Sequence, residues 1–102
     1  MHLNYGKFIH YEWNSSKSST NAKKHGVTFE EAKSVFLDEF ARLISDPSHS
    51  SDEDRFVLLG LSRRLRLLVV SHCYRERGHV VRIISARKAS QKEQRQYARY
   101  LS

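Results

Sequence analysis

Residues 55–86 decide the fold of this chain, and they read RFVLLGLSRRLRLLVVSHCYRERGHVVRIISA. Three apolar runs rich in Val, Leu and Ile lie within this stretch, a composition typical of β-strands. The runs span residues 55–61, 65–74 and 79–86, and only three or four residues separate one from the next. Parallel neighbours need a connection of a dozen or more residues, so these short connections predict two successive antiparallel hairpins.

The turn of the second hairpin sets which side chains share a face of the sheet. Gly78 is the only glycine in this turn and favours a three-residue loop that ends in a left-handed bulge. That loop places His72 directly opposite Arg82, on one face of the sheet. A two-residue turn at 76–77 is the alternative, which sets Ser71 opposite Arg82 and sends His72 to the other face.

Helices are predicted before and after these strands, because three segments carry helix start or stop signals. They are residues 15–25, between Asn14 and Gly26; residues 28–38, opened by a capping box at Thr28–Glu31; and residues 90–100, opened by a second box at Ser90–Glu93. Short strands are predicted at 8–13 and 40–44, and a polar surface loop at 45–54. The sequence therefore predicts one α+β domain over residues 1–102. We expect a mostly antiparallel sheet of about four strands, packed on one side with two N-terminal helices and one C-terminal helix.

The charges are distributed unevenly along the chain. Residues 1–54 contain six Lys and Arg against nine Asp and Glu, a net charge of −3. Residues 55–102 contain twelve against two, a net charge of +10, and ten of the eleven arginines lie here. A basic region attracts a polyanion, and the guanidinium fork suits phosphate oxygens and base edges. Nucleic acid is the first candidate, and a solvated basic surface is the alternative.

The residue types exclude several other classes of protein. Cys73 is the one cysteine, so an internal disulfide is impossible. The four glycines are isolated, which excludes a phosphate-cradling loop, and the six histidines have no metal-ligand spacing. We therefore expect no metal and no cofactor. No apolar run approaches the ~20 residues that span a membrane, and the N-terminus lacks a signal peptide, so we expect a cytoplasmic protein.

Two long motifs stand in order along the chain. KHGVTFEEA occupies residues 24–32, after Trp13–Asn14, and RIISARKA occupies residues 82–89, before Glu93 and Tyr97. Together with DRF at 54–56 they resemble the BrnT toxin family over about residues 12–98. The turn at 62–65 departs from that pattern, because it lacks the glycine that is common there in relatives.

The resemblance implies a RelE-like fold and a ribonuclease toxin of a type II toxin–antitoxin pair, which cuts RNA and arrests translation. It also implies a BrnA-like antitoxin of the ribbon-helix-helix kind, which neutralises the toxin. On this interpretation the toxin contacts operator DNA only through the antitoxin. Two other functions stay open from the residues themselves. One is a non-catalytic basic module that binds nucleic acid in transcriptional regulation, and the other is a partner that only binds the antitoxin.

RNA cleavage without a metal uses the 2′-hydroxyl as nucleophile and needs a base, a proton donor and positive charge at the phosphate. Arg82 lies mid-strand among apolar residues, where an arginine either pairs with a carboxylate or faces a cleft. Only two acids follow residue 54, so Arg82 is predicted to face a cleft and clamp the phosphate. His72, if it lies beside Arg82, is kept neutral by that charge and serves as the base. Arg87 is the third predicted catalytic residue, and a charge beside the start of the last helix with no catalytic role is an equally good interpretation of Arg87 and Lys88. Residues predicted to bind RNA are Lys24, Arg55, Arg66 and Lys88.

Structural roles are the alternatives for several of these side chains. Lys24 ends a helix, where a cation favourably meets the negative end of the helix dipole. Arg55 is equally able to pair with Glu53 or Asp54 on the surface. Tyr97 is able to stack on a base, but its spacing from Leu101 also fits a core stripe, which we favour.

Overall fold

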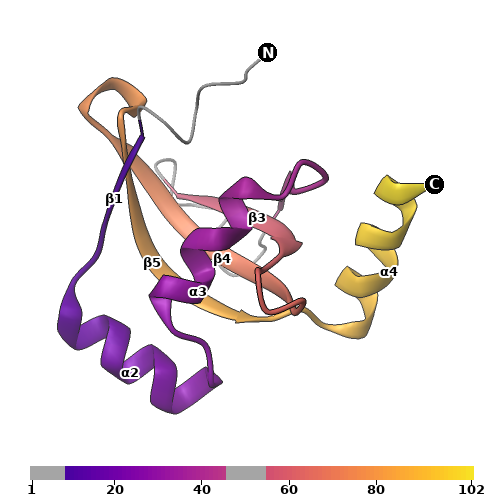
Figure 1. Cartoon of the computed structure of the whole chain (residues 1–102), viewed down its shortest axis with the longest axis horizontal. Helices are drawn as coiled ribbons and strands as arrows, with labels where there is room; N and C mark the ends of the chain where they lie inside the picture. Colours follow the sequence, from indigo (N-terminus) through magenta and orange to yellow (C-terminus); the bar gives the residue numbers. More distant parts are fainter. Residues whose placement is uncertain (1–8, 46–54) are drawn as a thin grey trace.

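The computed structural model describes residues 9–45 and 55–102 (Figure 1). The elements, in chain order, are β1 (His10–Glu12), α2 (Ser15–His25), α3 (Phe29–Ser34), the 3₁₀ turn η1 (Val35–Leu37), β2 (Arg42–Ile44), β3 (Phe56–Leu61), β4 (Leu67–Arg75), the 3₁₀ turn η3 (Glu76–Gly78), β5 (Val80–Lys88) and α4 (Gln91–Leu101). The predicted α+β class is confirmed. The predicted loop at 45–54 lies, apart from its first residue, outside the described residues.

The described strands form one sheet in the order β1-β5-β4-β3-β2. β3, β4 and β5 pair antiparallel, as the short connections predicted, and β2 pairs antiparallel with β3. β1 is different, because it lies parallel to β5 and makes the sheet a mixed one of five strands. The sheet is mostly antiparallel, as expected, but it has five strands where about four were expected, and one of its pairings is parallel. The partner of β1 comes at the far end of the chain, so no short connection reveals the pairing.

Helices cover both faces of the sheet, and the expectation that all of them lie on one side was wrong. α2 and α3 cover one face, here called the α2–α3 face, where Phe29, Leu68 and Ile83 belong to the larger apolar core (Figure 1). α4 lies on the opposite face, here called the α4 face, and packs there against residues that include Val69. Leu68 and Val69 are neighbours in β4, so ordinary strand alternation separates the two cores.

The predicted ends of the first and last helices are confirmed. The Asn14 side chain accepts a hydrogen bond from the Lys17 N–H at 3.0 Å, and Gly26 ends α2 with a left-handed φ of 70°. Ser90 and Glu93 make both hydrogen bonds of a capping box at the start of α4. These signals are local, and local chemistry was sufficient to place both helices.

Tyr97 holds α4 against the sheet, which confirms its predicted place in the core. Its ring is buried, and its hydroxyl donates a hydrogen bond to Asp38 Oδ2 at 2.6 Å. The same oxygen accepts the Leu61 N–H at 2.8 Å, so one carboxylate joins α4 to the end of β3. Burial and the neighbouring carboxylate raise the pKa of Tyr97 to about 12.

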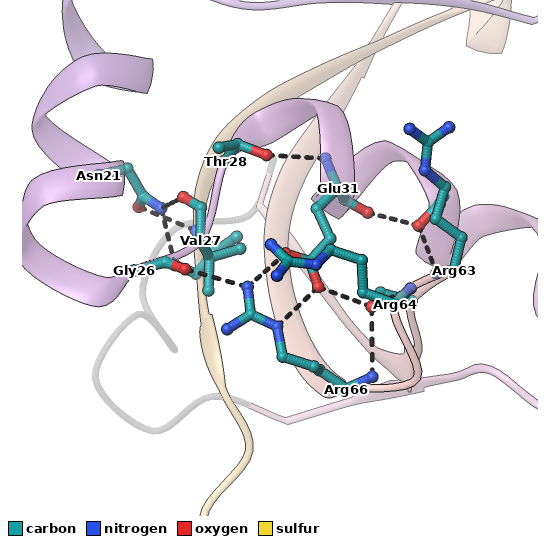
Figure 2. Close-up of polar contacts among 11 residues, drawn as sticks. Asn21, Gly26, Val27, Thr28, Glu31, Arg63, Arg64 and Arg66 are labelled. Atoms are coloured by element: carbon teal, nitrogen blue, oxygen red, sulfur yellow. Dashed lines mark hydrogen bonds and ion pairs between the residues drawn. The ribbon is translucent and has the colours of Figure 1, made fainter.

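Glu31 does not complete the capping box that was predicted for it. The Thr28 hydroxyl accepts from the Glu31 N–H at 3.1 Å, but the Glu31 carboxylate turns instead to the β3–β4 turn (Figure 2). There it accepts from the Ser62 hydroxyl at 2.7 Å and from both Nε and Nη2 of Arg66. Arg66 Nη2 also donates to the Gly26 carbonyl at 3.0 Å. The hydrogen bonds from Arg66, more than any other contact, hold the pKa of Glu31 below its usual range.

The β3–β4 turn is also where the sequence lacks the expected glycine. Leu65, in this turn, lies in the left-handed region with a φ of 62°, and its N–H donates to the Ser62 carbonyl at 2.8 Å. A left-handed conformation costs a residue with a Cβ roughly 1–2 kcal/mol. The turn closes in spite of that strain, and its Leu65 side chain lies exposed to solvent.

Candidate active site

The turn of the β4–β5 hairpin differs from both predicted forms. Arg75 pairs with Val80, which leaves a four-residue loop between them. Three successive loop residues have positive φ angles, 50° at Glu76, 59° at Arg77 and 89° at Gly78. A positive φ is uncommon in any residue except glycine, so nothing in the sequence signals it at Glu76 and Arg77. Both registers derived from shorter turns were therefore wrong.

The observed register separates the two residues that were predicted to form one site. Cys73 lies opposite Arg82, and His72 lies opposite Ile83. A β-bulge lies between Ser71 and His72, and on its other side Ser71 pairs with Ser85. Because neighbouring side chains of a strand point to opposite faces, His72 shares the α2–α3 face with Ile83, and Arg82 points to the α4 face. The predicted contact between His72 and Arg82 does not exist.

His72 is enclosed within the α2–α3 face. Its side chain is 0% exposed, and the rings of Phe36, Phe56 and Tyr74 surround it. Nδ1 lies 3.1 Å from the Val70 carbonyl oxygen, which only accepts, so Nδ1 carries the proton. Nε2 is then free to accept a hydrogen bond from the Tyr74 hydroxyl at 3.2 Å. Burial lowers the pKa of His72 from its ordinary value and favours the neutral imidazole.

Arg82 faces the α4 face and has a carboxylate partner there. Its Nη1 donates to Glu12 Oε2 at 2.9 Å, and Arg75 Nε lies 3.4 Å from the same oxygen. The parallel pairing of β1 with β5 makes this contact, because it sets Glu12 beside Arg82. Glu12 lies in the first half of the chain, so a prediction based on the acids after residue 54 does not include it. The signal was present in residues 10–13, where the polar His10 and Glu12 alternate with aromatic residues.

The Glu12 cluster, meaning Glu12, Arg75 and Arg82, lies on a part of the sheet that α4 leaves open. α4 packs over β3 and the start of β4, whereas the cluster lies beside the other end of β4, near η3 (Figure 1). The side chains are 41% exposed at Glu12, 57% at Arg75 and 33% at Arg82. Two guanidinium groups therefore meet a single carboxylate where solvent reaches all three side chains.

Arg87 lies further along β5 and holds the start of α4. Its Nη1 and Nη2 donate to the two oxygens of Glu93 at 2.8 and 2.9 Å, a bidentate ion pair. These bonds and those of the cap outweigh burial and lower the pKa of Glu93 to about 2. The Arg87 side chain remains 40% exposed beside this ion pair. Its predicted catalytic role stays a prediction.

The four residues predicted to bind RNA lie on different elements and do not form one cluster. Lys24 lines a hollow of about 300 Å³ between α2 and β5, together with Lys17, His25 and Ser85. Lys88 is exposed at the end of β5, and Arg55 is half-buried just before β3. Arg66 belongs to the Glu31 ion pair described above, which gives it a structural role.

Two further features bear on the class of protein. Across residues 9–45 and 55–102 there is no helix long and apolar enough to cross a membrane. The same residues contain no group of three or more His, Cys, Asp or Glu side chains arranged to hold a metal ion. The fold and the open face thus define a small α+β protein with exposed arginines on one sheet face, a surface suited to a polyanion.

Comparison with known proteins identifies the family. Residues 13–93 match the family described as the ribonuclease toxin BrnT of type II toxin–antitoxin systems, and the chain belongs to that family. The crystal structure of the Brucella abortus ribonuclease toxin BrnT has a similar fold, with a TM-score of 0.63 and 24% sequence identity. The match covers 81% of this chain and 99% of that one. A comparison with curated protein sequences finds no match.

Proposed function

We propose that this toxin is an endoribonuclease that cleaves RNA without a metal ion, by attack of a 2′-hydroxyl on the adjacent phosphate, and so arrests translation. The observation that carries the proposal is a pair of arginines on the open part of the α4 face, Arg75, which is exposed, and Arg82, which is partly exposed. Membership of a ribonuclease toxin family supplies the reaction class.

Positive charge is the catalytic element that these arginines provide. The transition state for 2′-hydroxyl attack carries extra negative charge on the phosphate oxygens, and fixed donors aimed at that charge stabilise it. A guanidinium offers five N–H donors in a rigid fork, so Arg82 is able to bond a phosphate oxygen while one donor stays on Glu12. Arg87 extends the same face toward α4. Lys24, on α2, and Lys88, which shares the α2–α3 face with Leu68, are proposed to contact phosphates on the other side of the sheet, and Arg55 is proposed as a further phosphate contact just before β3.

The antitoxin is proposed to cover the same basic face. A partner that masks Arg82 blocks the reaction without changing the fold, and acidic side chains are the natural complement of this surface. We infer a BrnA-like antitoxin of the ribbon-helix-helix kind, with Asp or Glu placed opposite Arg82 or Arg87. The antitoxin then supplies all contact with operator DNA. A toxin–antitoxin complex that leaves this face open would contradict this part of the proposal.

Incubation of purified toxin with a defined RNA in EDTA tests the proposal. We expect fragments that end in a 2′,3′-cyclic phosphate and a 5′-hydroxyl, and no cleavage when the nucleotide at the cut site is 2′-deoxy. RNA that is bound but stays intact would instead support the non-catalytic nucleic-acid-binding module. Cleavage that appears only after divalent cations are restored would contradict the metal-free mechanism.

A further inference from the structure

We propose that Glu12 is the general base of the reaction, the group that removes the proton from the attacking 2′-hydroxyl. This inference rests on the proposed ribonuclease function and deepens it. Glu12 comes from β1, at the opposite end of the chain from the arginines that it contacts, so only the folded sheet brings the three side chains together.

The position of Glu12 beside the phosphate-binding groups supports this role. One carboxylate oxygen, Oε2, receives both Arg82 Nη1 at 2.9 Å and Arg75 Nε at 3.4 Å. A phosphate that accepts a hydrogen bond from either guanidinium group therefore lies next to the Glu12 carboxylate. A general base must come within about 3 Å of the proton that it takes, and a partly exposed Glu on the same face meets that requirement.

Other proton acceptors of the hairpin region are less well placed. His72 is fully buried on the opposite face, with both ring nitrogens in hydrogen bonds. Glu93 is held by Arg87 and by the cap at Ser90, its side chain is only 16% exposed, and its pKa near 2 makes it a weak base. His10 is a rival among the described residues, because strand alternation puts it on the same face two residues before Glu12. It is included in the test below.

Substrate binding frees this carboxylate oxygen. In the free toxin Oε2 receives both guanidinium groups. When the scissile phosphate takes hydrogen bonds from those groups, Oε2 becomes available to accept the proton of the 2′-hydroxyl.

The step balances without any further reactant. The Glu12 carboxylate takes the 2′-hydroxyl proton, the O2′–P bond forms and the P–O5′ bond breaks. The leaving 5′-oxygen takes a proton from water, and Glu12 later returns its proton to solvent. The products are a 2′,3′-cyclic phosphate and a 5′-hydroxyl, as proposed above.

Glu12→Gln tests the inference, with Glu76→Gln in the exposed η3 turn as the matched control. Because general-base catalysis contributes about 10²–10⁴-fold, we expect kcat to fall at least 100-fold while KM stays within about threefold. The acid limb of the pH–kcat profile should disappear in Glu12→Gln, and Glu12→Asp should restore part of the rate together with that limb. Binding of an RNA with a 2′-deoxy nucleotide at the cut site should not weaken, since Gln removes a negative charge.

Three outcomes would overturn the inference. The first is a Glu12→Gln toxin with a kcat within threefold of wild type, and the second is a rise in KM with kcat unchanged, as expected of a merely structural ion pair. The third is that His10→Gln, and not Glu12→Gln, removes the acid limb. Wild-type toxin that binds RNA and does not cut it would overturn the proposed function itself, and the base with it.

Discussion

The polar side chains on the two faces of the β4–β5 hairpin have opposite environments. On the α2–α3 face, His72 is enclosed by aromatic rings, and each of its nitrogens has a hydrogen-bond partner within the protein. On the open part of the α4 face, Glu12, Arg75 and Arg82 contact one another and remain exposed to solvent. The first arrangement stabilises a fold, and the second is able to exchange its partners for a ligand.

The difference follows from a single step of register. Neighbouring residues in β4 point to opposite faces, so His72 and Cys73 divide between the core and the open surface. A hairpin shifted by one residue would place His72 beside Arg82 and bury a different side chain. Substitutions on the two faces should therefore affect different properties, with RNA cleavage changed on one face and stability on the other.

Arg82→Ala should have the largest effect and should act on cleavage alone. Loss of one donor that stabilises transition-state charge costs about 10²–10³-fold in kcat, and we expect a decrease of that size. Stability should change little, since a partly exposed ion pair contributes about 0–1 kcal/mol. Cleavage of a defined RNA and urea unfolding measure the two effects.

Arg77→Ala is the control for this prediction, because Arg77 is an exposed arginine in the adjacent turn. It removes the same charge from the same region and should change kcat by less than about threefold. If both variants lose cleavage equally, net charge and not the position of Arg82 explains the activity.

Glu31→Gln should have the opposite effect, a loss of stability with cleavage per folded molecule retained. Glu31 is buried and accepts hydrogen bonds from Ser62 and Arg66, and hydrogen bonds to a charged group contribute about 1.5–3 kcal/mol. We expect the free energy of unfolding to fall by about 2 kcal/mol in urea at pH 7. The pKa of Glu31 is lowered, so its contribution is present above pH 4.5 and is lost as the pH falls below that value.

Glu30→Gln provides the comparison for Glu31, because Glu30 is exposed in the same helix. Its substitution should change the free energy of unfolding by less than about 0.5 kcal/mol. Equal losses from the two variants would mean that helix charge, and not the contact with the β3–β4 turn, is responsible.

Signals contained within a few residues were read correctly from the sequence. Asn14, Gly26 and the Ser90–Glu93 box each act on backbone groups within one helical turn, so their effect depends little on the rest of the fold. Thr28 shows where local signals stop being sufficient. Its own cap is present, but a stronger long-range partner, Arg66, takes the carboxylate that was predicted to complete the box.

The candidate site depended on contacts that a single sequence does not show. The basic character of the second half of the chain follows directly from its residue types, and the catalytic role of Arg82 stays a prediction. Glu12 was missed because its parallel pairing with β5 joins distant segments, and His72 was placed wrongly because Glu76 and Arg77 adopt positive φ angles. Each error is one of pairing, and pairing in a sheet is decided by the whole fold.

His72→Gln should have the smallest effect, one that depends on pH. The pKa of His72 is lowered by burial from 6.5, so the folded state favours the neutral ring and the unfolded state binds the proton more readily. This contribution is fully present above pH 6.5 and is lost as the pH falls below it. The loss is at most about 1.4 kcal/mol per pH unit. We expect wild type to lose about 1 kcal/mol between pH 6.5 and 5.5, and His72→Gln to lack this component.

His79→Gln, at an exposed position before β5, is the control and should keep the wild-type pH dependence. Cleavage by folded His72→Gln at pH 7.5 then tests the division between the two faces. Neither ring nitrogen of His72 reaches solvent, so kcat should stay within about threefold of wild type. A 100-fold loss in a variant that is still folded would instead place the chemistry on the α2–α3 face. In that case Tyr74, which contacts His72 Nε2 and is itself partly exposed, would be the group that connects the buried imidazole to the RNA.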